Sequence, residues 1–402
     1  MSFRRTAALA SLLLVVPLSS AFSQDAAAVG ERLKSALSRQ GTTLTFDRIS
    51  GDAARMVVEG ATVSIAPEPG EIALGDITLA DIKEEAGSLV IGSVTLPNYS
   101  TTQEDMTVEA TGIGFTNLRF PSEDASDPVA GLLMYDTAAV QNVSVRVGGK
   151  QAFVMDRLHF EVDAPVDGRP MTFSGAADKF SADLSLVEDA NSRKLIEALD
   201  LQTVNGRFDL AGYWQPGDGR LAIEQYDVSI EKAGTLGLTF DFGGYTPDFI
   251  KSLQELQKTM AAAPENADNS AQSLAMLGLM QQLTFHSARI RFDDDSLTGK
   301  VIDYLAGQQK VKPGDVVNQA KGLLPFLMAQ LDNAELTTQT TAAVNTYLDA
   351  PKSIEISARP TNPVPFAAIA AGAMSQSPKD LIKMLGVSLT ANEPALDDGE
   401  AE

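Results

Sequence analysis

The sequence has 402 residues, with 53 acidic and 31 basic side chains, a formal net charge of −22 and no cysteine. Without cysteine the chain has no disulfide, thiol nucleophile or thiolate metal site. The sequence contains no cluster of Lys and Arg of the kind that binds nucleic acid or anionic membranes. The acids are spread along the whole length, which is typical of a solvated acidic surface.

The first 23 residues have the three parts of a secretion signal. Arg4 and Arg5 form a basic start, residues 7–18 form an apolar run, and residues 19–23 are mostly small. The apolar run is shorter than the roughly 20 residues that cross a bilayer, and Pro17 interrupts it. We therefore predict a cleaved signal peptide at residues 1–23 rather than a membrane anchor.

The cleavage site is predicted to follow Ser23, because Ala21 and Ser23 are small residues at the positions that signal cleavage requires. The mature chain then begins at Gln24, and loss of Arg4 and Arg5 makes its net charge −24. No later stretch of the sequence is both long and apolar enough to span a membrane. These features predict a protein of the periplasm without a stable membrane anchor.

Between about residues 41 and 244, apolar residues recur with a period of two, which indicates half-buried β-strands. Leu158, Phe160 and Val162 show the alternation clearly, and the Gly148–Gly149 pair before them predicts a hairpin turn. Similar runs, many of them separated by turn signals, lie at residues 61–65, 72–82, 88–96, 106–120, 143–147, 170–186, 207–214, 221–230 and 235–242.

Helical patterns are few in the first half and frequent in the second. Short helices are predicted at 26–37 and 192–201. A helical hairpin follows at about 246–283, with Thr246 as N-cap, Pro247 in the first turn and a loop at 261–270. Because strands at 235–242 and 284–292 flank this hairpin, we expect an insertion between neighbouring strands.

The last part, at about 296–391, is predicted to be rich in helix. Pro313 opens one helix that Pro325 should end or kink. A final helix is predicted between a Ser377–Pro378 start and a stop at Gly386, with strands at 353–358 and 387–390 around it.

Together these elements predict an α+β fold that is mainly antiparallel β. It is a long curved sheet meander with a helical hairpin insertion and a helical C-terminal part. We predict a single β-rich domain over residues 24–391 and a disordered acidic tail at 392–402.

Side chains suited to catalysis or metal binding are sparse. The strand pattern places His159 on a polar face and His286 on the face of Ala288 and Ile290, with neither in a metal-ligand spacing. Trp214 lies at a strand end, where packing is the expected role. We predict no catalytic residue, no cofactor and no metal site, and hence a protein that is not an enzyme.

The dense carboxylate cluster Asp293–Asp295 has one alternative reading. Carboxylates bind Ca²⁺, but consecutive strand residues point to opposite faces, which does not match a calcium loop. A turn and a helix cap are favoured instead, because acids stabilise helix N-termini.

Segment 288–297 reads Ala-Arg-Ile-Arg-Phe-Asp-Asp-Asp-Ser-Leu, and it follows a strand at 234–242 and precedes a helical C-terminal part. With the secretion segment and the strand meander, it resembles the AsmA-type and YdgA-type (DUF945-like) families of bacterial envelope proteins. Segment 351–364, with Ile354, Ile356 and Pro360, is similar to uncharacterised exported proteins of alphaproteobacteria.

The resemblance implies a long curved sheet whose apolar concave face holds lipid chains, and a role in envelope assembly, maintenance or lipid traffic. Those families generally keep an N-terminal anchor, whereas the signal here is predicted to be cleaved. Two functions remain open: a carrier that holds a lipid or other hydrophobic ligand on the apolar sheet face, or a structural or protein-interaction module of the envelope with a filled core.

Overall fold

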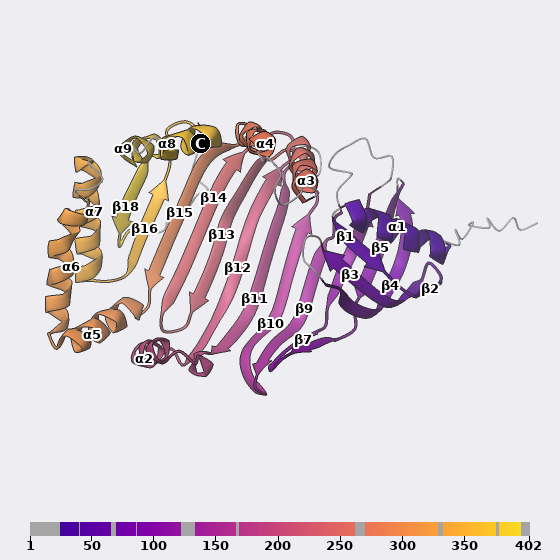
Figure 1. Cartoon of the computed structure of the whole chain (residues 1–402), viewed down its shortest axis with the longest axis horizontal. Coiled ribbons are helices and arrows are strands. Elements are labelled where there is room, and N and C mark those ends of the chain that lie inside the picture. Colours follow the sequence, from indigo (N-terminus) through magenta and orange to yellow (C-terminus); the bar gives the residue numbers. More distant parts are fainter. Residues whose placement is uncertain are drawn as a thin grey trace, which may run out of the picture.

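The computed structural model describes residues 25–39, 41–65, 70–85, 87–121, 133–165, 169–261, 270–328, 333–374 and 378–394 (Figure 1). The predicted signal, with Ala21, Ser23 and Gln24, lies outside these ranges, as do Ser377 and residues 395–402 of the predicted tail. The described residues form one antiparallel sheet of 18 strands together with nine α-helices. The fold is therefore α+β and mainly antiparallel β, as the strand pattern predicts.

The strands cross the sheet almost in the order of the sequence. From β3 the successive neighbours are β4, β5, β8 and β9, then each strand in turn to β15, and finally β16 and β18. Short strands extend this series: β1 and β2 lie along β3, the β6–β7 hairpin lies along β9, and β17 lies along β15.

The strand bounds are β1 Thr42–Thr45, β2 Arg48–Gly51, β3 Arg55–Ile65, β4 Ile72–Glu85, β5 Ser88–Thr95, β6 Tyr99–Gln103, β7 Met106–Thr111, β8 Gly114–Phe120, β9 Thr137–Val147, β10 Lys150–Asp163, β11 Met171–Asp183, β12 Thr203–Gln215, β13 Arg220–Ile230, β14 Gly234–Gly243, β15 Thr284–Asp294, β16 Ser353–Ala358, β17 Val364–Pro365 and β18 Val387–Ala391.

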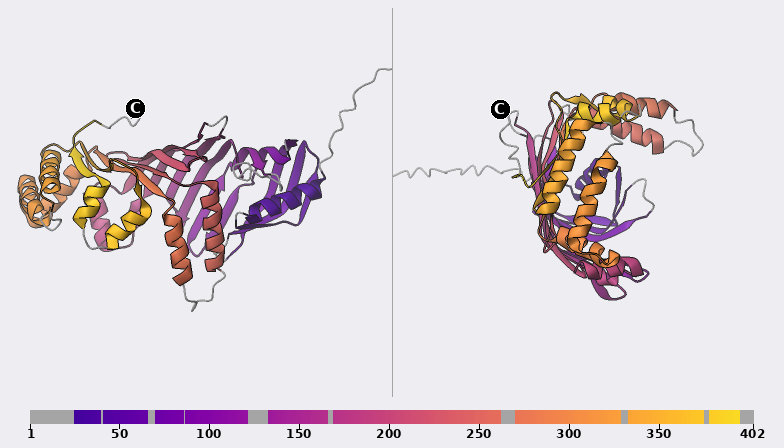
Figure 2. Two further views of the ribbon diagram at one scale, coloured as in Figure 1. Left: turned by 90° about the horizontal axis from the view of Figure 1, so that it is seen from above. Right: turned by 90° about the vertical axis from the view of Figure 1, so that its left-hand side faces the viewer.

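Within the described residues, the helices stand at the edges and ends of the sheet, and none of them covers its middle (Figures 1 and 2). Helix α1 packs on the N-terminal strands. Helix α2 lies beside one set of strand ends, and α3, α4, α8 and α9 lie beside the opposite set. Helices α5 to α7 lie at the C-terminal end of the sheet. Their bounds are α1 Ala26–Arg39, α2 Ala190–Ala198, α3 Pro247–Ala261, α4 Ser270–Met280, α5 Leu297–Gln309, α6 Pro313–Met328, α7 Ala334–Asp349, α8 Phe366–Met374 and α9 Pro378–Leu385.

The sheet is curved into an open half-cylinder, seen end-on in the right-hand view of Figure 2. Helices α3, α4, α8 and α9 project from its edge on the concave side. Such curvature follows from strand twist and from irregularities in pairing. Register shifts occur in several of the long pairs, among them β11–β12, β12–β13, β13–β14 and β14–β15.

A large cluster of buried apolar residues lies at the N-terminal end, where α1 covers the concave face of β1 to β5 and β8. Val29 and Leu33 on α1 are buried against strand residues such as Met56, Leu89 and Ile91. This helix is amphipathic, with its apolar residues on one stripe, so burial of that stripe accounts for its position.

Several local predictions are confirmed. The Thr246 hydroxyl accepts a hydrogen bond from Phe249 N at 3.2 Å and caps α3, and the Gly148–Gly149 turn joins β9 to β10. The hairpin α3–α4 lies between the paired strands β14 and β15, as an insertion. Asp294 accepts a hydrogen bond from Thr298 N at 2.8 Å, so one of the three consecutive acids caps α5.

Other local predictions are wrong. The run 106–120 is two strands rather than one, because Gly112 has a φ of +63° and turns the chain between β7 and β8. Of the two outcomes predicted for Pro325, an end or a kink, the end is wrong, because α6 continues through it to Met328. Proline lacks an N–H and disfavours the helix interior, but here it lies within the last turn of α6, where only a short segment follows.

Candidate apolar ligand site

The register of the strands places the apolar residues of the sheet on one continuous face. Residues paired across neighbouring antiparallel strands share a face, and the faces alternate along each strand. Three rows illustrate the apolar face: Ala138–Phe160–Gly175–Leu210–Tyr226, Val228–Leu236–Phe292–Ile354–Ala391, and Leu238–Ile290–Ile356–Leu389.

The apolar face is the concave one. Phe242 and Phe285 belong to it, and both rings pack edge-on against Phe366 of α8, at centroid distances of 6.3 Å. Phe242 also packs on Tyr245, which leads into α3. Because α3 and α8 project on the concave side (Figure 2), the apolar residues line the concave face of the half-cylinder. We call this lining, from β9 to β16, the trough.

The trough is incompletely covered. Tyr226, Leu236, Ile290 and Ile356 are 37%, 43%, 50% and 44% exposed, although none of them lies on an edge strand. Ile290 and Ile356 are directly paired, and Leu236 lies one step along the same face, so these exposed side chains are contiguous. Contiguous exposed apolar surface is uncommon on soluble proteins and marks binding sites more often than chance.

Glycines in the strands leave space on the concave face, so that phenylalanine rings of neighbouring strands lie close to the backbone. A Cβ added at Gly175 would lie 2.4 Å from the ring of Phe160, and one added at Gly212 would lie 2.6 Å from the ring of Phe173. Each ring therefore lies flat over the glycine that faces it on the neighbouring strand. The same arrangement joins Phe180 to Gly206. The trough is thus lined by flat aromatic surfaces rather than filled by them.

A partly open apolar cavity of about 320 Å³ continues the concave face at its N-terminal end. Its roof is formed by Leu33 and Leu37 of α1, and its walls include Val63, Ile77 and Leu118 from β3, β4 and β8. The row that begins at Phe115, which also lines the cavity, runs through its partner Ala138 into the trough.

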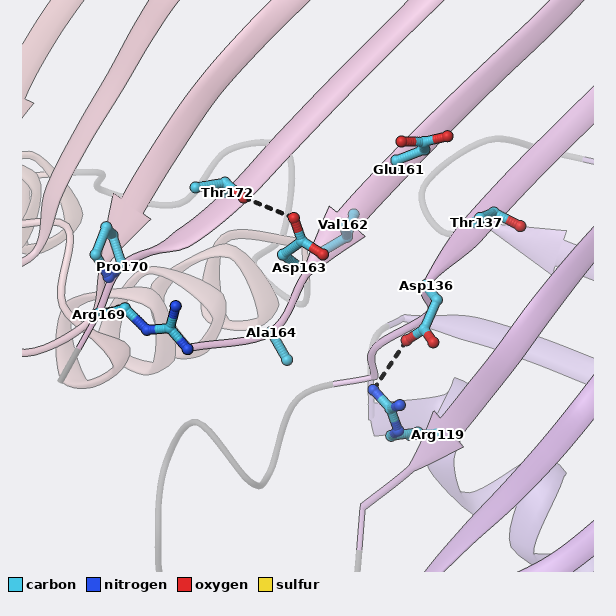
Figure 3. A pocket seen from close by; sticks show the side chains of 10 residues that line it. All are labelled: Arg119, Asp136, Thr137, Glu161, Val162, Asp163, Ala164, Arg169, Pro170 and Thr172. Atoms are coloured by element: carbon cyan, nitrogen blue, oxygen red, sulfur yellow. Dashed lines mark hydrogen bonds and ion pairs between the residues drawn. The ribbon is translucent and has the colours of Figure 1, made fainter. Parts of the chain in front are cut away.

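The convex face is polar and carries a shallow charged pocket of about 870 Å³ at the edge of β8 to β11 (Figure 3). Arg119 and Asp136 form an ion pair at 3.0 Å across it, and the Thr172 hydroxyl donates to Asp163 at 3.2 Å. Glu161, Asp163 and Arg169 are exposed, and Arg119 and Asp136 are paired with each other. Such surface pairs contribute little stability and hold no buried polar group toward a ligand.

The side chains considered for chemistry lie apart from one another. His159 is on the convex face, as predicted, with its Nδ1 3.2 Å from Arg157 O. The prediction for His286 is wrong: a β-bulge at residues 285–287 turns its ring to the convex side, where Nε2 lies 3.4 Å from Thr284 Oγ1. Across the described ranges, no three His, Asp or Glu residues are grouped to hold a metal.

Trp214 has the packing role expected for it. Its ring is buried at the end of β12, and Nε1 donates a hydrogen bond to Tyr245 O at 2.8 Å. This bond joins β12 to the segment that leads into α3.

None of the helices in the described segments has both the length and the apolar character of a membrane span.

Comparison with known proteins gives one partial match. A family model matches residues 227–392. That family is described as an uncharacterised protein, and the matched residues run from β13 to the end of β18. No curated protein matches the chain. Nothing in these comparisons links the chain to the AsmA-type or DUF945-like families, so that resemblance remains a proposal.

The sequence carried a signal for the trough that the strand pattern alone did not reveal. Glycines inside strands mark places where another group approaches the backbone closely. Gly175, Gly206 and Gly212 all lie inside predicted strands or at their start, but only the register shows that a phenylalanine faces each of them.

Proposed function

We propose that this protein is a non-catalytic carrier of the bacterial periplasm that holds a lipid or another hydrophobic ligand in the trough. The observation that carries the proposal is the contiguous exposure of Leu236, Ile290 and Ile356 on an apolar concave face. A sheet with an apolar face normally buries that face against another layer. Here the helices stand at its edges (Figure 1), which leaves room for a ligand as the missing layer.

The dimensions of the trough suit an acyl chain. Neighbouring strands lie roughly 4.8 Å apart, so the seven steps from β9 to β16 extend for roughly 34 Å. An acyl chain of one leaflet spans about half of the roughly 30 Å hydrocarbon core of a bilayer. A chain lying across the strands therefore fits within the trough, and its head group would remain in water at the open side.

The periplasmic location in this proposal is supported by the predicted signal at residues 1–23. A role in envelope maintenance or lipid traffic is supported by the AsmA-type resemblance and by the apolar trough together.

Native mass spectrometry of the protein, exported with its own signal and purified without detergent, tests the carrier function. We expect adducts with the masses of envelope lipids, which disappear after unfolding in denaturant and refolding in lipid-free buffer. Protein that is free of adducts, and that takes up none when mixed with phospholipid vesicles, would contradict a carrier function.

One observation favours a second function, a protein-interaction module. Leu323, Phe326 and Leu327 of α6 are 54%, 76% and 63% exposed, and their spacing places them on one face of the helix. A contiguous apolar helix face of this kind is typical of protein docking. The same mass spectrometry separates the functions, because a docking module needs no lipid.

A further inference from the structure

The cavity under α1 has walls that can be traced residue by residue. Val58, Leu79 and Ile91 form part of its floor and are almost completely buried, and Leu33 and Leu37 close it from the helix side. At about 320 Å³ it lies near the lower end of the roughly 300–1,000 Å³ of small-molecule pockets.

The position of α1 over the sheet is fixed by contacts on two sides of the helix. The ring of Phe46 lies against Gly30, where an added Cβ would be only 2.8 Å from it, and Lys34 Nζ lies 4.3 Å from the centre of the same ring. On the other side of the helix, Arg32 donates to Gly87 O at 2.6 Å. Phe46 and Arg32 thus hold α1 in place, with Leu33 and Leu37 lining the cavity.

The chemistry of the walls defines what fits. The residues that line the cavity are aliphatic or aromatic except for Thr42, and none of them is charged. Thr42 and Tyr135 carry hydroxyl groups. A cavity without polar partners does not hold water firmly and instead takes apolar molecules. It offers nothing that would recognise a phosphate, carboxylate or sugar, so only the hydrocarbon part of a ligand is complementary to it.

The position of the cavity indicates how such a ligand continues. Phe115 packs edge-on against Tyr135 at 5.9 Å, and both residues line the cavity. Phe115 is also paired with Ala138, the first residue of the row that leads to Phe160 and Gly175 in the trough. A chain whose end lies in the cavity would therefore meet the low floor of the trough directly beyond this aromatic pair.

We infer that the cavity is a pocket for the terminal segment of one unbranched alkyl chain, with the remainder of the molecule on the trough. The inference rests on the proposed function for that remainder, whereas the pocket depends only on residues of α1, β1, β3 to β5, β8 and the segment at 133–135, together with Leu96 after β5. The expected ligand is therefore a molecule with an unbranched alkyl chain, whose terminal methyl group enters the pocket under α1 first.

The test uses 1-decanol, an alkyl probe without a charged head group, titrated into delipidated protein in a calorimeter. Ile77→Trp and Val63→Phe each place extra volume in the cavity and are expected to weaken decanol binding at least tenfold. Ile77→Val keeps the cavity open and should bind like the wild type. Ile290→Gln, which changes only the trough, should also leave decanol binding unchanged. Circular dichroism confirms that each variant is folded.

The outcomes separate the two proposals. Decanol binding that persists in both filled variants, or that is absent from the wild type, overturns the pocket and leaves the carrier function to the lipid-adduct measurement. Binding lost in Ile290→Gln but kept in Ile77→Trp places the alkyl chain in the trough alone and also overturns the pocket. Loss in the filled variants only, with Ile77→Val unaffected, is the result that we expect.

Discussion

Leu236→Gln combined with Ile290→Gln is expected to lower lipid occupancy about tenfold or more while leaving the stability of the protein nearly unchanged. The two side chains are about half exposed on the concave face of β14 and β15, so the fold gains little from them. A bound chain would lose apolar contact worth about two buried CH₂ groups, at about 0.8 kcal/mol each, and 1.4 kcal/mol is a factor of ten. Native mass spectrometry gives the occupancy, and urea unfolding gives the stability.

Thr239→Gln with Ser287→Gln is the matched control for this pair. These residues lie on the same two strands, β14 and β15, and on the convex face. The control variant should keep its lipid. Equal loss of lipid from both variants would show that the substitutions act through the strands rather than through the trough, and equal retention would show that the ligand lies elsewhere.

Arg291→Ala is expected to cost about 3 kcal/mol of unfolding free energy, because it leaves a carboxylate buried without its partner. Arg291 on β15 is only 11% exposed, and its Nη1 lies 3.3 Å from Oε2 of Glu355, which is 6% exposed on β16. A hydrogen bond from Arg291 to Asp293 is the main cause that raises the pKa of Arg291, while burial opposes it. Arg291 also donates to Glu393 O at 3.1 Å, so the cluster ties the segment that follows β18 to the sheet.

The measurement is urea unfolding of single and double variants. Arg291→Ala with Glu355→Ala should recover part of the loss, since no buried charge is then left alone. Arg207→Ala is the comparison, because its ion pair with Asp209 is largely exposed and should contribute less than about 1 kcal/mol. A loss from Arg291→Ala as small as that from Arg207→Ala would refute the role of the cluster.

The strand meander was predictable because each strand has one apolar and one polar face. The alternation of Leu158, Phe160 and Val162 with polar residues fixes which face of β10 is inward, and the Gly148–Gly149 turn fixes its partner. Helix starts were predictable where capping residues are explicit, as at Thr246. These are local signals, and they survive because they agree with the long-range pairing.

The trough and the cavity were not predictable in this way. Whether an apolar sheet face is covered depends on where the helices pack, and nothing in the pattern of α3 or α8 shows that they stand at an edge. The bulge that reverses His286 is a single extra residue against β14, which no alternation signals in advance. The cavity depends on Phe46 lying against Gly30, a contact between a helix and the segment that joins β1 to β2.

The central claim is that the concave face holds the ligand. Photolabelling with palmitic acid that carries a diazirine on its alkyl chain, followed by peptide mapping, tests it residue by residue, because neighbouring residues of a strand lie on opposite faces. We predict labels on trough residues such as Leu236, Ile290 and Ile356, and none on convex neighbours such as Thr239 and Ser287. Labels that fall equally on both faces, or mainly on the convex one, would contradict the account.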